Sequence, residues 1–196
     1  MRKIELGYLN INETGRKYVN DVLSSNRLSA GRYIGQLEKL FAQEHGCRHG
    51  IMCNSGTSAL QIALAALKER YGFCDGDEVI VPAVTFIASS NIVLQNRMNP
   101  VFVDVDPLCY NIEPGLIEKK ITKKTRAIIP VHLFGLPSEM SPILEIAKRR
   151  RLKIIEDSCE TMFASYKGRP VGSFGEMGCF STYVAHLLVT GVGGLI

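Results

Sequence analysis

The sequence lacks any arrangement of cysteines that would indicate a zinc finger or a disulfide framework. Its six cysteines, at positions 47, 53, 74, 109, 159 and 179, include no Cys-x-x-Cys pair and no Cys/His pair at zinc-finger spacing. Scattered cysteines are mostly small core residues, so we expect reduced thiols in a cytoplasmic protein. We predict no metal site either, because Asp104 and Asp106 together supply too few oxygen ligands for a dedicated one.

The sequence also lacks a strong excess of charge and a long uninterrupted hydrophobic run. Its net charge of +4 over 196 residues falls well short of the basic balance of a nucleic-acid-binding domain. Two stretches without formal charge, 79–96 and 177–196, contain Ser, Asn, Thr or Gly and are typical of buried segments rather than membrane spans. Residues 1–6 have no apolar core of a signal peptide. We therefore expect a protein that binds neither nucleic acid nor membrane.

What the sequence does contain is an alternation of short β-type runs with longer helical patterns. We predict strands at 78–81, 100–105, 127–131 and 153–155, and helices at 33–44, 59–71, 86–95, 114–121 and 141–151. Ser141 and Pro142 are expected as the N-cap and first residue of the last helix. This alternation predicts an α/β fold with a largely parallel sheet, which binds its ligand at the carboxyl ends of the strands.

The end of the sequence is an apolar run, Val-Gly-Gly-Leu-Ile at 192–196. A folded domain rarely ends on such an unshielded run. We therefore expect this chain to be the front part of a longer protein.

Three places in the pattern carry residues suited to ligand chemistry. Residues 54–58, Asn-Ser-Gly-Thr-Ser, join a strand to a helix, where free amides and hydroxyls make either a phosphate cradle or an ordinary N-cap. Asp157 ends a strand and could pair with a ring nitrogen or cap a helix. His186 lies alone in an apolar run, where a histidine is usually structural. Taken alone, each place keeps both interpretations.

Several motifs, in their order along the chain, resemble the DegT/StrS group of pyridoxal-phosphate (PLP) sugar aminotransferases. They include Ser-Gly-Thr-Ser-Ala-Leu at 55–60, Pro-Ala-Val-Thr-Phe at 82–86, Pro-Val-His-Leu-Phe-Gly at 130–135, Ile-Glu-Asp at 155–157 and Val-Gly-Ser-Phe-Gly at 171–175. Each motif is weak alone, but the ordered set is specific and runs through almost the whole chain.

The resemblance implies a fold and an assembly. The fold is a three-layer α/β/α sandwich, the large domain of an aspartate aminotransferase-like PLP-dependent transferase. Residues 1–30 would form an N-terminal segment, and residues 31–196 would form an incomplete large domain without its small C-terminal domain. The family's enzymes are homodimers with a shared active site, so the resemblance implies this assembly as well.

The resemblance also implies an activity and a set of site residues. The enzyme would act on a nucleotide-linked 4-keto sugar in polysaccharide or deoxy- and amino-sugar biosynthesis, with PLP or pyridoxamine phosphate (PMP) as its cofactor. Gly56 and Thr57 match the cradle of the cofactor phosphate, and Ser181 matches a second hydroxyl on it. Phe86 matches the aromatic residue that stacks on the pyridine ring, and Asp157 matches the carboxylate that pairs with the ring nitrogen.

Two positions depart from the family pattern. Glu160 stands where the family usually has glutamine, close to the cofactor's phenolic oxygen, and a carboxylate there disfavours a phenolate unless one of the two groups is protonated. His186 stands where the family has the lysine that bonds to the cofactor and moves a proton during amine transfer. Histidine can move protons but makes no stable imine, so ordinary transamination should be badly impaired.

One branch of the family, the sugar 3-dehydratases, has the same exchange of lysine for histidine. Resemblance to this branch implies that PMP is held without a covalent bond, and that His186 removes a proton while the C3 hydroxyl of the sugar leaves. A neutral imidazole has a basicity suited to this work near pH 7. Two alternatives stay open: an aminotransferase that takes its amine from elsewhere, and an inactive homologue that binds a nucleotide sugar or a partner.

Overall fold

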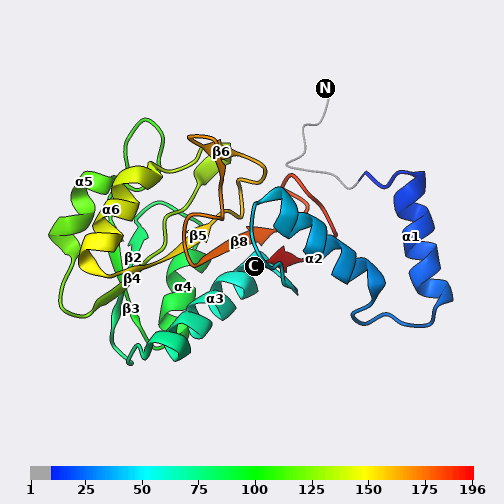
Figure 1. Ribbon diagram of the computed structural model, residues 1–196, viewed down its shortest axis with the longest axis horizontal. Coiled ribbons are helices and arrows are strands. Elements are labelled where there is room, and N and C mark those ends of the chain that lie inside the picture. Colours follow the sequence, from blue (N-terminus) through cyan, green and yellow to red (C-terminus); the bar gives the residue numbers. More distant parts are fainter. Residues whose placement is uncertain (1–9) are drawn as a thin grey trace, which may run out of the picture.

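The computed structural model describes residues 10–196, in which helices and short strands alternate along most of the chain (Figure 1). The α-helices are α1 Glu13–Ser24, α2 Arg32–Glu44, α3 Gly56–Tyr71, α4 Ala88–Gln95, α5 Pro114–Ile117 and α6 Met140–Arg150, and two short 3₁₀ turns are η1 Glu118–Lys120 and η2 Leu133–Gly135. The strands are β1 Met52–Cys53, β2 Glu78–Pro82, β3 Asn99–Val103, β4 Thr125–Ile128, β5 Lys153–Asp157, β6 Ser165–Tyr166, β7 Arg169–Pro170, β8 Met177–Ser181 and β9 Gly194–Leu195. Residues 1–9, which belong to the predicted N-terminal segment, lie outside the described residues.

A seven-stranded sheet in the order β1-β9-β8-β5-β4-β2-β3 forms the centre of the fold. Its strands from β3 to β8 pair in parallel, whereas β9 pairs antiparallel with both β8 and β1. The parallel strands end at one edge of the sheet, and their following loops gather there. The prediction of a mainly parallel α/β sheet is confirmed.

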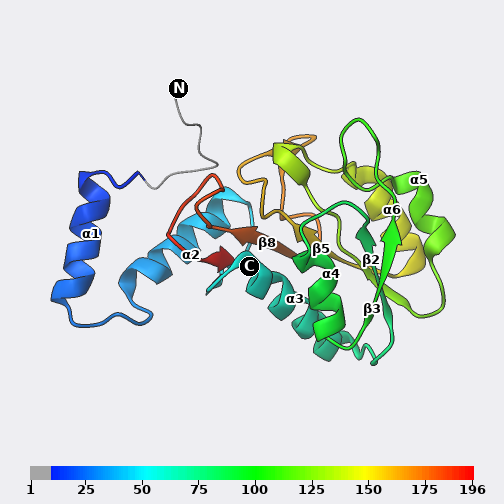
Figure 2. The same ribbon diagram turned by 180° about the vertical axis from the view of Figure 1, so that it is seen from behind.

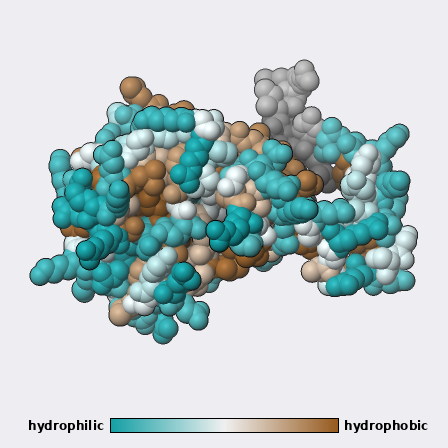
Figure 3. Space-filling model, in the orientation of Figure 1, coloured by the Kyte–Doolittle hydropathy of each residue, from teal (hydrophilic) through white to brown (hydrophobic). Residues whose placement is uncertain are grey.

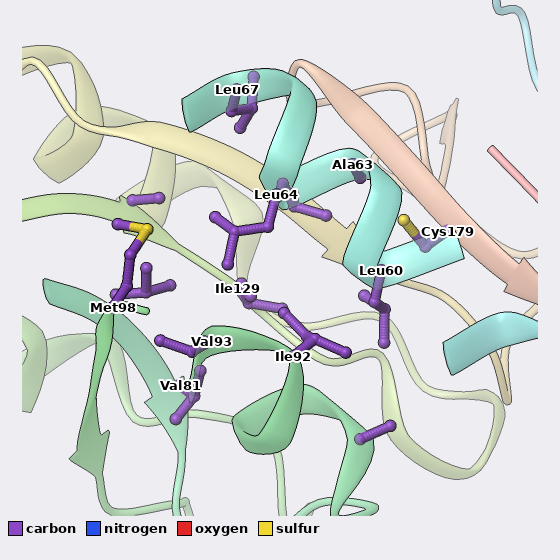
Figure 4. Close-up of a cluster of buried hydrophobic side chains, with 14 of the residues drawn as sticks. Leu60, Ala63, Leu64, Leu67, Val81, Ile92, Val93, Met98, Ile129 and Cys179 are labelled. Atoms are coloured by element: carbon purple, nitrogen blue, oxygen red, sulfur yellow. The ribbon is translucent and has the colours of Figure 1, made fainter. Parts of the chain in front are cut away.

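Two hydrophobic cores lie on opposite faces of this sheet because successive side chains of a strand point to opposite sides. Val79 and Val81 of β2 belong to the core that includes α3 and α4, as do Ala127 and Ile155 of the neighbouring strands. Figure 4 shows part of this core between α3 and α4. The intervening Ile80, with Ile128 and Ile154, belongs to a second core with α5 and α6. The result is the three-layer α/β/α sandwich.

The first helix, α1, stands apart from the sheet in both ribbon views (Figures 1 and 2). Its N-cap is Asn12, whose side chain accepts a hydrogen bond from the Gly15 amide, and the helix contains no buried residue. The sequence patterns did not predict this helix, because it contributes nothing to a core from which its apolar positions could be recognised.

The helix α6 begins earlier than predicted. Met140 is its first residue and Glu139 occupies the N-cap position, so the prediction of Ser141 as N-cap is wrong. The Ser141 hydroxyl instead accepts hydrogen bonds from Lys167 Nζ at 2.9 Å and Tyr166 OH at 3.1 Å. Pro142 is the third residue of the helix and not the first as predicted; it is tolerated there because the first-turn amides have no intrahelical partner.

No helix among residues 10–196 is long and apolar enough to span a membrane. The six cysteines, all within this range, are unpaired.

Candidate active site

A cavity of about 510 Å³ opens at the carboxyl edge of the parallel strands. Its walls come from the end of β5, the end of β8, the β2–α4 loop, the N-terminus of α3 and the 183–193 turn. The lining residues are Ser55, Gly56, Thr57, Leu60, Thr85, Phe86, Ala88, Val131, Leu133, Asp157, Cys159, Glu160, Ser181, Tyr183, Ala185, His186, Val192 and Gly193. Topology therefore brings together residues that are far apart in the sequence.

The N-terminus of α3 provides the anion-binding wall of the cavity. The Ser55 side chain caps the helix by accepting from the Ser58 amide at 3.1 Å, while the amides of Gly56 and Thr57 find no partner among residues 10–196. A Cβ on Gly56 would lie 2.7 Å from Cys159 Sγ and 2.8 Å from Ser181 Cβ. Glycine thus lets the helix start pack against β8, where its free amides and nearby hydroxyls can bind a phosphate.

Asp157 is a buried carboxylate at the end of β5. Its Oδ2 accepts from the Ser89 hydroxyl at 2.8 Å and its Oδ1 accepts from the Cys159 amide at 3.2 Å. Thr85 lies within hydrogen-bonding distance of Ser89, at 2.9 Å between the hydroxyl oxygens. Asp157 takes part in no salt bridge within the described part of the chain, so its charge is available to a cationic group of a ligand. The site can therefore bind a ligand with a protonated ring nitrogen.

Two side chains of different character face the same cavity. Phe86 is 67% exposed, which leaves its ring available for stacking against a flat ligand. Glu160 is tied to the neighbouring turn η2, since its Oε2 accepts from the Phe134 amide at 3.2 Å. Phe134 has a positive φ of 53°, an uncommon conformation for a bulky residue, and this hydrogen bond helps to hold it.

His186 lies in the turn between β8 and β9. The turn is closed at its base by a hydrogen bond between the hydroxyls of Thr182 and Thr190 at 2.6 Å. The His186 Nδ1 is buried and has no hydrogen-bond partner within residues 10–196, so Nε2 is the nitrogen that a ligand in the cavity can reach. Within residues 10–196 no hydrogen bond to Nδ1 fixes the tautomer of this ring.

Cys159 is a thiol rather than a thiolate in this site. Burial, and then the charge of Asp157, raise the pKa of Cys159 well above its usual value. A thiol with a raised pKa is a poor nucleophile. Cys159 therefore shapes the wall beneath Gly56 and takes no covalent role.

All seven residues predicted from the sequence line this one cavity: Gly56, Thr57, Phe86, Asp157, Glu160, Ser181 and His186. The structure brings them together, while their chemical roles stay predictions. The sequence analysis missed Thr85 and Ser89, which orient Asp157; their only signal is a Thr and a Ser close to Phe86 at the start of a helix. It also missed Tyr183 and Cys159. Among residues 10–196, no group of three or more His, Cys, Asp or Glu could hold a metal ion.

Comparison with known proteins accounts for this arrangement. The profile of the DegT/DnrJ/EryC1/StrS aminotransferase family matches residues 9–196. The chain belongs to this family. The resemblance inferred from the sequence motifs is confirmed, and so is the fold that it implied.

Relatives within the DegT/DnrJ/EryC1/StrS family carry more than one activity in their names. GDP-perosamine synthase of Caulobacter vibrioides is 44% identical over 182 residues, which are 92% of this chain and 48% of that protein. GDP-4-keto-6-deoxy-D-mannose 3-dehydratase of Yersinia pseudotuberculosis is 36% identical over 91% of this chain and 46% of that protein. The chain thus spans about half the length of the curated relatives it matches.

Solved structures show the same architecture. One is Escherichia coli GDP-4-keto-6-deoxy-D-mannose-3-dehydratase with bound hydrated PLP. Its superposition on this chain has a TM-score of 0.93 at 32% identity, and the matched region covers 100% of this chain and 51% of that chain. A structure of GDP-4-keto-6-deoxymannose-3-dehydratase with bound GDP-perosamine gives a TM-score of 0.92 at 32% identity, over 97% of this chain and 50% of that chain.

Proposed function

We propose that the cavity binds PLP or PMP. Four of its features fit that group: free amides and hydroxyls for a phosphate, a buried carboxylate without a cation, an exposed aromatic ring, and a volume of about 510 Å³. Gly56, Thr57 and Ser181 would hold the phosphate, Asp157 would pair with the ring nitrogen, and Phe86 would stack on the ring. The relatives whose solved structures contain PLP or PMP support this assignment.

When bound, PMP supplies an amine that condenses with a ketone and a protonated ring that withdraws electrons. This chain's own residues would do the rest. Asp157, held by Ser89 and the Cys159 amide, would keep the ring nitrogen protonated. His186 would take up a proton at Nε2 and return it, and the apolar side chains at the cavity wall would exclude water.

We propose further that the chemistry is of the 3-dehydratase type. The observation that carries this proposal is that His186 lines the cavity and no lysine does so among residues 10–196. Without a lysine, no covalent bond can hold PLP at this position, so the cofactor stays non-covalent. Oxygen would then leave from the carbon next to the ketone, as the name of the Yersinia relative states for its own substrate.

A second candidate is amine transfer to a nucleotide-linked keto sugar. It is favoured by the 44% identity to GDP-perosamine synthase, which exceeds the identity to the dehydratase relative. In that case another group would have to move the proton that a lysine moves in the rest of the family. If the protein is an aminotransferase, substituting His186→Lys should therefore improve amine transfer. An inactive homologue would bind no cofactor.

We also propose a nucleotide-linked 4-keto sugar as substrate, a place in polysaccharide or deoxy- and amino-sugar biosynthesis, and a cytoplasmic homodimer. Six unpaired cysteines support a reducing compartment.

The proposed homodimer rests on exposed apolar residues near the cavity mouth. Each of the following is more than half exposed: Phe86, Ile87, Tyr183, Leu187 and Val192. In Figure 3 hydrophobic patches interrupt a mainly polar surface. Exposed apolar residues around a site favour its burial against a second subunit.

The test is the product formed from PMP and a GDP-linked 4-keto-6-deoxy sugar, analysed by mass spectrometry. A product that has lost the C3 oxygen supports the dehydratase assignment, and an amino sugar supports the second candidate. Substituting His186→Asn should lower dehydration by at least about 100-fold, as expected for loss of a general base. Unchanged activity in this variant would contradict the assignment.

A further inference from the structure

A hydrogen-bonded cluster of His132, Glu156 and Thr161 lies next to the cavity, and we call it the floor of the cavity. His132, at its centre, does not line the cavity. His132 is 0% exposed and lies between the end of β4 and the turn η2. Its ring nitrogens are both in hydrogen bonds: Nδ1 accepts from the Ser138 amide at 3.0 Å, and Nε2 lies 3.1 Å from Glu156 Oε2. A backbone amide can only donate, so Nδ1 carries no proton. Nε2 therefore carries it and donates to Glu156, and the ring is neutral.

Glu156 is the second part of this network. It is also 0% exposed, and its carboxylate accepts three more hydrogen bonds, from the amides of Gly172, Phe174 and Gly175 at 2.6–2.7 Å. Four donors on two oxygens compensate this buried anion, which has no Lys or Arg partner among residues 10–196. Neighbouring residues of a strand point to opposite faces, so this bonding on one side of β5 fixes the side from which Asp157 projects toward the cavity.

The main chain of His132 joins the same floor to two further cavity segments. Its amide donates to the Asp157 carbonyl at 2.9 Å, and its carbonyl accepts from the Thr161 hydroxyl at 2.6 Å. The Thr161 hydroxyl oxygen in turn accepts from the Gly135 amide at 3.0 Å. Beside this contact, the Phe134 amide donates to Glu160, the next residue along the cavity wall.

We propose that neutral His132, paired with Glu156, is a positioning residue for the cavity. It acts through Asp157 on one side and through the 133–135 turn and Glu160 on the other, without itself touching a ligand. Three segments that carry cavity residues meet around His132: its own segment 131–133, the end of β5, and 159–160. The part of the proposal that concerns cofactor binding rests on the proposed function.

The experiment compares variants by two measurements: the dissociation constant for PMP from absorbance titration, and amide hydrogen exchange at Phe134 and Gly172. Substituting His132→Ala removes both ring contacts, so we expect exchange at both amides and the dissociation constant each to rise about tenfold or more. The His132→Gln side chain keeps an N–H donor near the position of Nε2. It should bring the dissociation constant back to within about threefold of the unsubstituted protein.

The matched control is Ile143→Ala, because Ile143 is fully buried in the core beneath α6 and does not line the cavity. It should lower the melting temperature while leaving PMP affinity unchanged to within about twofold. If Ile143→Ala weakens PMP binding as much as His132→Ala at an equal loss of melting temperature, His132 is merely structural and the proposal is overturned. Failure of His132→Gln to restore binding overturns it as well.

Should His132→Ala fail to fold, Thr161→Val serves in its place. This change keeps the shape and removes the hydroxyl that links Gly135 to His132. Faster exchange at Phe134, together with weaker PMP binding, supports the proposal, and unchanged values of both contradict it. If the unsubstituted chain binds no PMP, the proposed cofactor is wrong, but the exchange at Phe134 and Gly172 in the variants still decides whether His132 positions the floor.

Discussion

At the scale of single residues, the cavity is lined by polar groups that each keep an atom available for hydrogen bonding or ion pairing with a ligand. Among residues 10–196, the start of α3 has two amides without a partner because Ser55 caps only the third position. Within the same range Asp157 has no cationic partner, while Ser89 and an amide fix its orientation. The buried Nδ1 of His186 likewise has no hydrogen-bond partner in this part of the chain. These groups are thereby available to a ligand.

Gly56 allows a direct test of the phosphate cradle. A methyl group in Gly56→Ala would lie within 3 Å of Cys159 Sγ and Ser181 Cβ, so the start of α3 must move away from β8. We expect a loss of about 1–3 kcal/mol of unfolding free energy and an increase of at least about tenfold in the PMP dissociation constant.

The control is Gly35→Ala in α2, where a Cβ meets no atom within 4 Å. Alanine there should raise the unfolding free energy by about 0.5–1 kcal/mol and leave PMP binding unchanged. Equal PMP affinity in Gly56→Ala and the unsubstituted protein would show that α3 does not hold the phosphate.

At the scale of elements, short polar links hold the parallel strands in place at the edge opposite the cavity. Asp77 precedes β2 and accepts from the Cys74 amide at 2.8 Å and from Arg126 Nε at 2.9 Å. Arg126 lies on β4, so this carboxylate joins two neighbouring strands. Burial works to raise the pKa of Asp77, but these hydrogen bonds and the positive charge of Arg126 outweigh burial and lower it below its usual 3.8.

The pH dependence of stability follows from that direction. A carboxyl group whose pKa is lower in the folded than in the unfolded state stabilises the fold above the unfolded pKa, and this contribution is lost as the pH falls through the folded pKa. Substituting Asp77→Asn should therefore cost about 1–3 kcal/mol at neutral pH, and the difference from the unsubstituted protein should shrink below about pH 4.

Urea unfolding between neutral and acidic pH measures this difference. The exposed Glu44, for which Glu44→Gln is the control, should show no comparable effect. A cost of Asp77→Asn that stays constant down to the lowest pH would contradict the assigned role of the charge.

Some elements could be predicted from the sequence and others could not, and the difference has physical reasons. Buried parallel strands are short runs of Val and Ile, so a strand was predicted at 78–81, where β2 lies, without knowledge of its neighbours. The pairing of β1 with β9 depends on Met52 meeting Leu195, which no local pattern encodes. The cavity residues were predictable as a set because the ordered motifs resemble a family. The contacts of Ser89, His132 and Glu156 were not, since burial and hydrogen bonding arise only in the folded chain.

At the scale of the whole molecule, the cavity opens among exposed apolar side chains. We expect a homodimer in which this surface is covered, and sedimentation velocity should detect it. Ile87 is exposed and lies in sequence between the cavity residues Phe86 and Ala88. Substituting Ile87→Lys should shift the protein toward monomer, because a charge buried in an apolar interface is costly.

Leu108 provides the matched control for this prediction. It is 90% exposed, and neither Leu108 nor its sequence neighbours line the cavity, so Leu108→Lys should leave the assembly unchanged. A dimer that persists in Ile87→Lys, or one that dissociates equally in Leu108→Lys, would contradict an interface at the cavity mouth.

The central proposal is that the cavity holds its cofactor without a covalent bond, because His186 stands where the family resemblance implies a lysine. The most direct measurement is mass spectrometry of the protein after incubation with PLP and reduction with borohydride. We predict no stoichiometric adduct on the unsubstituted chain, and an adduct on the peptide that contains position 186 in the His186→Lys variant. A stoichiometric PLP adduct on a lysine of the unsubstituted chain, or none in His186→Lys, would contradict the account.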